Sequence, residues 1–189
     1  MVYGAKAEIA LNRAVECLSH SNPGLPAHVM RDRVDGLTDV QQSRRAKVTL
    51  LDWSPFEQAA YMDADTASYQ DITTGFDMLD DGFDLILCAS NNQGDELLWH
   101  VGQDDKASTL EAVRNCEPLQ LQAGVFFVAR NTRTQALWRA WRDEWERFGN
   151  QDQGALLRAL ARVPVRMWLL GHPWNSSAGA IIGHHFGAC

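Results

Sequence analysis

The segment Ala59-Ala60-Tyr61-Met62-Asp63-Ala64-Asp65-Thr66 joins a short apolar run to two aspartates that stand one residue apart. An apolar run of this length predicts a buried strand. Two carboxylates at the end of a strand repel each other unless a cation lies there, and carboxylate oxygens suit Mg²⁺ or Mn²⁺, which in turn hold a diphosphate. The segment therefore predicts a divalent-cation site at a strand end, the alternative being a solvated acidic turn.

The composition is that of one folded domain. The chain has 189 residues, of which 46% are hydrophobic, and seven of them are tryptophan. This length allows one domain with a sizeable core and is short for two, and the apolar content argues against disorder. The formal net charge is −7 and the basic residues are scattered. Binding to polymeric DNA or RNA therefore has no electrostatic support.

The four cysteines are widely spaced and form no C-x-x-C pair, which argues against a zinc site and a redox motif. Cys17 and Cys88 lie in apolar segments, so we expect buried free thiols in a reducing compartment. The sequence contains no apolar stretch of 18 residues and no signal peptide. We therefore expect a cytoplasmic protein without a membrane span, and the sequence leaves open whether it forms a homo-oligomer.

Helical periodicities and apolar runs alternate along the chain. We expect helices at residues 5–19, 43–51, 73–80, 132–148 and 154–162, and strands at residues 27–30, 59–62, 83–88, 124–129, 163–170 and 180–186. This alternation predicts a single α/β domain with a mainly parallel sheet covered by helices on both faces. Ligands of such sheets bind beyond the carboxyl ends of the strands, where Asp32, Asp63 and His184 lie in the sequence or nearby.

An aromatic stripe runs through the expected helix at residues 132–148. Trp138, Trp141, Trp145 and Phe148 recur at spacings of three and four. Such a stripe is typical of a helix face that packs against a sheet, and a stacking platform for ligands is the alternative. We expect it in the core.

Several short motifs follow one another along nearly the whole chain. They are Tyr3-Gly4-Ala5-Lys6, the turn Pro23-Gly24-Leu25-Pro26, the expected strand end at Asp32, the basic residues Arg44, Arg45 and Lys47, the segment Asp63-Ala64-Asp65-Thr66, Gly124-Val125-Phe126-Phe127 with Asn131, Asp152-Gln153-Gly154-Ala155-Leu156, Trp174-Asn175, and His184-His185-Phe186-Gly187. In this order the chain resembles a small GT-A fold glycosyltransferase of the nucleotide-diphospho-sugar transferase superfamily, similar to its glycogenin and galactosyltransferase branch. The resemblance implies a Rossmann-like GT-A domain over residues 1–189, with a first strand that is either very short or lost.

The resemblance also implies a metal site. Asp65 is the better candidate for direct ligation, Asp63 would ligate the ion or contact the ribose, and His184 would complete the shell, with Gly187 as the glycine of an H-x-x-G pattern. Mn²⁺ accepts imidazole more readily than Mg²⁺ does, so a histidine ligand favours Mn²⁺. The alternative for His184 is an ordinary polar residue near the end of a strand.

For the nucleotide-sugar donor, the resemblance implies contacts from Tyr3, Gly4, Asp32, Arg44 and Lys47, in addition to Asp63. Tyr3 would stack on the base and Asp32 would accept a hydrogen bond from it. Arg44 and Lys47 would contact the phosphates or the base. The alternatives are a solvated helix face for the two basic residues and a turn cap for Asp32.

Asp152 corresponds to an acidic residue that faces the acceptor or the transferred sugar, where it could act as a base or as an orienting group. It is also a good helix N-cap, which is the alternative for it. For the acceptor we expect contacts from Asn92, Gln93, Trp174 and Asn175.

The expected activity is metal-dependent transfer of a sugar from a nucleotide-diphospho-sugar, with a UDP-sugar as the favoured donor. The acceptor is unknown and could be a glycan, a lipid-linked intermediate, a protein, a small molecule or a modified nucleobase. The alternative is a degenerate GT-A domain that acts as a nucleotide-binding or scaffold protein without turnover. A nucleotidyltransferase is less favoured because no glycine-rich phosphate loop occurs early in the chain.

Overall fold

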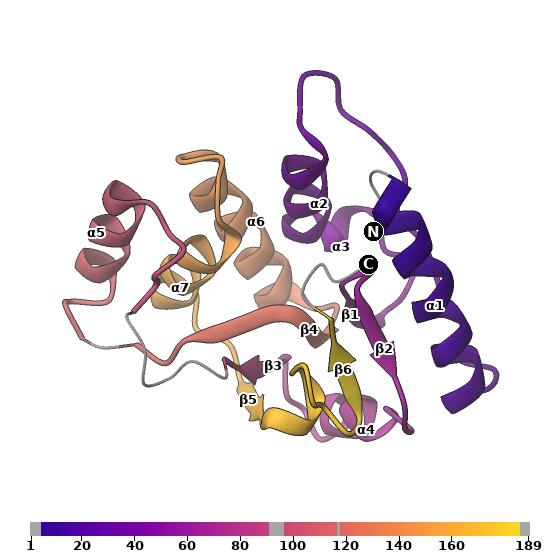
Figure 1. Cartoon of the computed structure of the whole chain (residues 1–189). Helices are drawn as coiled ribbons and strands as arrows, with labels where there is room; N and C mark the ends of the chain where they lie inside the picture. The colour runs from indigo at the N-terminus through magenta and orange to yellow at the C-terminus, as the bar shows by residue number, and fades with distance from the viewer. Residues whose placement is uncertain (1–4, 91–96, 117, 186–189) are drawn as a thin grey trace.

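The central element of the computed structural model is a mixed four-stranded sheet (Figure 1), and the structure describes residues 5–90, 97–116 and 118–185. The strands are β1 (Gln58–Met62), β3 (Leu85–Ala89), β4 (Leu121–Ala129) and β5 (Met167–Leu170), in the order β1-β4-β3-β5. β4 is antiparallel to both β1 and β3, whereas β3 and β5 are parallel. Three strands therefore run in one direction, as expected of a mainly parallel sheet, but the reversed β4 between two of them makes two of the three pairings antiparallel.

Helices cover this sheet, and their bounds are α1 (Ala5–Ser21), α2 (Asp39–Val48), α3 (Leu50–Trp53), α4 (Thr74–Asp80), α5 (Gln103–Ala112), α6 (Thr132–Glu146) and α7 (Asp152–Arg162). A short antiparallel pair, β2 (Thr66–Ser68) with β6 (Ile182–His184), lies beside the sheet, and the 3₁₀ turn η1 (His172–Trp174) precedes β6. None of the helices among the described residues is long and apolar enough to cross a membrane.

β4 separates two apolar cores. Its side chains alternate between the faces of the sheet. Phe126 stacks on Tyr61, with 4.7 Å between ring centroids, and packs against Trp138 and Trp141 of α6. Phe127 lies on the other face, with α4 and η1. Because β4 is buried on both faces, its sequence is a nearly continuous apolar run.

The aromatic stripe of α6 is part of the core, as predicted. Trp138, Trp141 and Trp145 are all buried. The helix begins at Asn131, whose side chain accepts hydrogen bonds from the backbone N–H groups of Arg133 and Thr134.

The N-terminal third departs most from the expected elements. Residues 27–30 form no strand. The expected helix at residues 43–51 begins earlier, at a capping box between Thr38 and Gln41, and divides into α2 and α3 at Thr49. The strands expected at residues 163–170 and 180–186 are shorter, and β2 was not predicted. Three residues are too short for a periodic signal to distinguish a strand from a turn.

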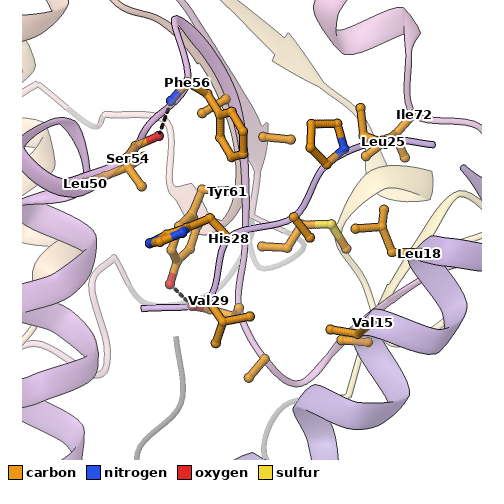
Figure 2. Close-up of a pocket in the computed structure, with 18 of the residues that line it drawn as sticks. Val15, Leu18, Leu25, His28, Val29, Leu50, Ser54, Phe56, Tyr61 and Ile72 are labelled. Carbon is orange, nitrogen blue, oxygen red and sulfur yellow. Dashed lines mark hydrogen bonds between the residues drawn. The ribbon is translucent and has the colours of Figure 1, made fainter. Parts of the chain in front are cut away.

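An apolar cavity of about 180 Å³ lies between α1, residues 25–29 and β1 (Figure 2). Leu18, Leu25, Val29 and Phe56 are among its lining residues. β1 is an edge strand of the described sheet, so this cavity lies along its outer side.

Cys17, Cys88 and Cys116 are free thiols. Cys88 is buried in β3, as expected, and its burial raises the pKa of the thiol to about 12. Cys17 is only half-buried, so the expectation of full burial was wrong for this residue. Its position on the helix leaves part of the side chain exposed to solvent.

Candidate metal and donor site

A polar cavity of about 480 Å³ opens at the carboxyl end of β1, where α1, α2 and the start of α7 converge. Charged residues from three elements line it: Lys47 of α2, Asp63 and Asp65 after β1, and Asp152 of α7. The other lining residues are Ala7, Ala10, Asp39, Val40, Ser43, Arg44, Ala64, Gln122, Ala123, Gly124, Gln151 and Gln153. The cavity is therefore lined by several carboxylates together with the basic side chains of Arg44 and Lys47.

The structure brings the three expected metal ligands together. One ligand atom each of Asp63, Asp65 and His184 lie within 4.8 Å of one another. The Nε2 atom of His184 is 3.2 Å from Oδ1 of Asp65. His184 is buried and the two aspartates are half-buried, so the group borders the cavity and is not freely solvated.

A tight turn and the small sheet produce this grouping. After β1, the backbone N–H and the side-chain hydroxyl of Thr66 both donate hydrogen bonds to the carbonyl oxygen of Asp63. Thr66 then pairs with His184 across β2 and β6, and the N–H of His185 donates to the carbonyl of Asp65. Two segments that are more than a hundred residues apart in the sequence are thus locked side by side.

Lys47 connects the metal group to Asp152. Its Nζ lies 3.0 Å from Oδ2 of Asp152 and 3.5 Å from Oδ1 of Asp63. Burial opposes the charge of Lys47, but the attraction of Asp152 and then of Asp63 outweighs it and raises the pKa of the lysine. Burial likewise opposes ionisation of Asp152, and the charge of Lys47 overcomes it and lowers the pKa of that carboxyl. Both groups are therefore charged at neutral pH.

Tyr61 of β1 orients the carboxylate of Asp63. Its hydroxyl donates a hydrogen bond to Oδ1 of Asp63, and its ring lies 5.4 Å from the Nζ of Lys47. Burial and the neighbouring charge of Asp63 raise the pKa of Tyr61 well above its ordinary value, so the phenol keeps its proton.

Two indoles of α6 hold the backbone around the site by hydrogen bonds. Trp138 Nε1–H donates to the carbonyl of Lys47, and Trp141 Nε1–H donates to that of Asp152.

The geometry argues against capping as the main role of Asp152. The N-cap of α7 is Gln151, whose side chain makes no capping hydrogen bond, and Asp152 is the first residue inside the helix. Its carboxylate is buried and paired with Lys47. Oδ2 of Asp152 is a buried atom and lies 3.0 Å from Nζ of Lys47. Asp152 thus lines the cavity with a carboxylate that the lysine holds in place.

The other expected site residues divide into three groups. Arg44 lines the cavity one turn before Lys47, and its Nη1 lies 3.3 Å from Oδ1 of Asn150. Asp32 is exposed and is not among the cavity-lining residues, because the expected strand before it does not form. Tyr3, Gly4, Asn92 and Gln93 lie outside the described residues.

The structure does not place Trp174 or Asn175 on the cavity wall, where the expected acceptor contacts would be. Trp174 is buried in the core, 5.9 Å from Phe127 between ring centroids. Asn175 is 1% exposed and contacts His184 instead. Both residues are therefore buried and are not among the residues that line the cavity.

Sequence reasoning missed the role of Gly124. A Cβ atom at this position would lie 2.5 Å from Cε1 of His184 and 3.0 Å from Oδ2 of Asp63. Only glycine leaves room for the two side chains where β4 passes beneath them. A glycine inside an apolar strand often marks such a close approach, so a signal was present in the sequence.

Comparisons with known proteins identify the fold. No model of a known protein family matches the sequence, and no curated protein matches it. Among solved structures, a glycosyltransferase involved in the glycosylation of the major capsid of PBCV-1 matches with a TM-score of 0.60 and 14% identity, over 97% of this chain and 90% of that one. An active-site mutant of LgtC matches with a TM-score of 0.54 and 10% identity, over 90% of this chain and 70% of that one. The chain has the fold of the GT-A glycosyltransferases.

Proposed function

We propose that the chain is a metal-dependent glycosyltransferase that transfers a sugar from a nucleotide-diphospho-sugar, with a UDP-sugar as the donor. One observation carries the proposal. The carboxylates of Asp63 and Asp65, which line the polar cavity, lie close to the imidazole of His184 in a chain with the GT-A fold. A donor of this class carries a diphosphate, which needs a cation in such an acidic setting.

The residues fit a divalent ion. Two carboxylates and one imidazole form a mixed oxygen and nitrogen set, which suits Mn²⁺ better than Mg²⁺. Asp65 and His184 would hold the ion, and Asp63, already held by Tyr61 and Lys47, would ligate it or contact the ribose. When bound, the ion supplies a positive charge that stabilises the departing diphosphate.

Lys47 and Arg44 supply the remaining positive charge. They lie one turn apart on α2 and both line the cavity. Lys47 is already buried and oriented by two carboxylates, so it would meet a phosphate without prior reorganisation of its side chain. Arg44 is half-buried and would bind the outer part of the donor.

Asp152 acts in this proposal as an orienting group. Its lowered pKa makes it a weak base at neutral pH, since an effective general base has a pKa close to the pH at which it works. Because Asp152 lines the cavity, its carboxylate would accept a hydrogen bond from a hydroxyl of the transferred sugar or of the acceptor. The acceptor could be any of the classes named above.

Titration calorimetry with UDP and UDP-sugars, with and without Mn²⁺, tests the proposal. We expect binding that requires the ion, together with slow release of UDP from one UDP-sugar. Asp65→Ala should abolish both, whereas Asp143→Ala, which removes an exposed carboxylate of α6, should change neither. Absence of binding to every nucleotide-sugar in Mn²⁺ would refute the proposal, and tight binding without turnover on any acceptor would support the scaffold alternative.

A further inference from the structure

The ring of His184 is held at both of its nitrogen atoms. Nε2 faces Oδ1 of Asp65 at 3.2 Å, and Nδ1 lies 2.7 Å from Oδ1 of Asn175. His184 is 6% exposed and Asn175 is 1% exposed, so water does not compete for the second contact. An acceptor at Nδ1 requires that this nitrogen carries a proton.

The fold fixes Asn175 against β6. Asn175 follows the 3₁₀ turn η1, whose Trp174 side chain packs into the core. The next residue, Ser176, accepts a hydrogen bond at its carbonyl from the N–H of His184, at 2.9 Å. The carbonyl of Pro173 accepts another from the N–H of Ile181. The backbone is therefore tied to the β6 segment on both sides of Asn175.

We propose that Asn175 is a positioning residue of the metal centre, an inference that rests on the proposed function. By accepting the Nδ1–H of His184, Asn175 directs Nε2 to the ion at the position that faces Asp65. Partners at the second nitrogen of a ligating histidine set both the tautomer and the ring orientation. Gly124 also contributes to this position, because the absence of a Cβ atom there leaves space for the ring of His184.

Three variants test this role. Asn175→Leu keeps most of the side-chain volume but removes the acceptor, Asn175→Asp keeps an acceptor oxygen, and Ser176→Ala is a matched control. Ser176 is adjacent and fully buried, and its hydroxyl has no hydrogen-bond partner among the described residues. Thermal unfolding of each variant establishes that it is folded.

Electron paramagnetic resonance on the nucleotide-free protein supplies two measurements that do not depend on activity. Free Mn²⁺ gives the dissociation constant, and the spin-echo modulation from ¹⁴N reports whether an imidazole nitrogen binds the ion. We expect Asn175→Leu to weaken Mn²⁺ binding by about 10- to 100-fold and to reduce the ¹⁴N modulation. Asn175→Asp should retain both signals, and Ser176→Ala should match the wild type.

The outcomes separate this inference from the proposed function. If the wild type binds Mn²⁺ with ¹⁴N modulation and folded Asn175→Leu binds it equally well, the positioning role is wrong while the metal site stands. If Asn175→Leu does not fold, Asn175→Asp decides, because loss of the modulation in that folded variant would contradict the role. If the wild type binds Mn²⁺ neither alone nor with UDP, both proposals fail.

Discussion

Helix α7 contributes to two charge clusters that differ in their access to the polar cavity and in their cation. Near its start, Asp152 pairs with Lys47, which also faces Asp63. Two turns later, Arg158 lies between Glu144 of α6 and Asp105 of α5. We call these the open cluster and the closed cluster, because only the first borders the polar cavity. Both place one cation between two carboxylates.

The closed cluster is saturated around its cation. Arg158 is 1% exposed and donates to the side chains of Asp105, Glu144 and Thr109 and to the backbone carbonyl of Glu144. Gly154 leaves the space, since a Cβ there would lie 2.8 Å from Oδ1 of Asp105. Helices α5, α6 and α7 lie together at one end of the molecule (Figure 1), and the planar guanidinium of Arg158 links α7 to the other two through Asp105 and Glu144.

The open cluster uses lysine, a point charge with a flexible stem, and its contacts are longer and fewer. Burial and charge are common to both clusters, so they do not by themselves identify a functional site. What distinguishes the open cluster is its position at the polar cavity.

Breaking the closed cluster should cost stability and little else. Glu144→Ala removes one of the two carboxylates that pair with Arg158, and removal of one partner of a buried ion pair destabilises a protein by about 3–5 kcal/mol. Chemical denaturation measures this loss, and activity per folded molecule should stay near that of the wild type. Glu146→Ala, an exposed neighbour on α6, is the control and should be nearly silent. If Glu144→Ala were as stable as the wild type but inactive, the closed cluster would serve activity and not stability, contrary to our assignment.

Breaking the open cluster should cost activity. Lys47→Met removes the cation proposed to meet the donor phosphates, and loss of one oriented group of this kind lowers kcat by about 10²- to 10³-fold. Steady-state release of UDP in Mn²⁺ measures the effect. Arg45→Met, on the same helix but outside the cavity, should be close to wild type. Equal activity of the two variants would remove Lys47 from the mechanism.

Filling the space at Gly124 should disturb the metal centre more mildly. In Gly124→Ala, the new Cβ would press on the side chains of His184 and Asp63. We therefore expect the affinity for Mn²⁺ to fall by about tenfold or more, as it does when residues that orient metal ligands are changed. Gly102→Ala is the matched control, because a Cβ there meets no atom within 4 Å. Calorimetric titration of Mn²⁺ decides, and unchanged affinity would show that the site has more freedom than the contacts suggest.

The smallest effect is the dependence of stability on pH in the closed cluster. Burial of Glu144 opposes ionisation, but its hydrogen bonds with Arg158, Arg147 and Arg162 lower the pKa of the carboxyl. A lowered pKa stabilises the fold above the unfolded value of about 4.3, and this contribution disappears as the pH falls through the lowered folded value. Unfolding free energies between pH 3 and 7, with Glu144→Gln for comparison, measure it. A wild-type slope equal to that of the variant would contradict the assignment.

The sequence predicted the fold class and the convergence of distant site residues, because both follow from local patterns. The apolar run before Asp63 and the short strand at His184 were readable, and the structure brings these residues together with Asp65. That they bind a metal stays a prediction. The reversed direction of β4 was not readable, since an apolar strand looks the same in either orientation.

Partners distant in sequence decide what several polar residues do in the structure. Asp152 was expected to face the acceptor or the transferred sugar, with an N-cap as the alternative, and only the structure shows its pairing with Lys47. Asn175 was expected among the acceptor contacts on the basis of the resemblance, and the structure shows it buried against His184. Asp32 was placed at the end of a strand that does not form.

The hydrogen bonds from two indoles of α6 link intrinsic tryptophan fluorescence to the open cluster. Trp138 and Trp141 each donate a hydrogen bond to the backbone of a residue that forms the cluster, Lys47 and Asp152. Indole emission responds to nearby charge and to changes in hydrogen bonding, so a ligand that redistributes charge between those two residues would alter intrinsic fluorescence. The protein thus carries its own optical probe of the cavity, without an added label.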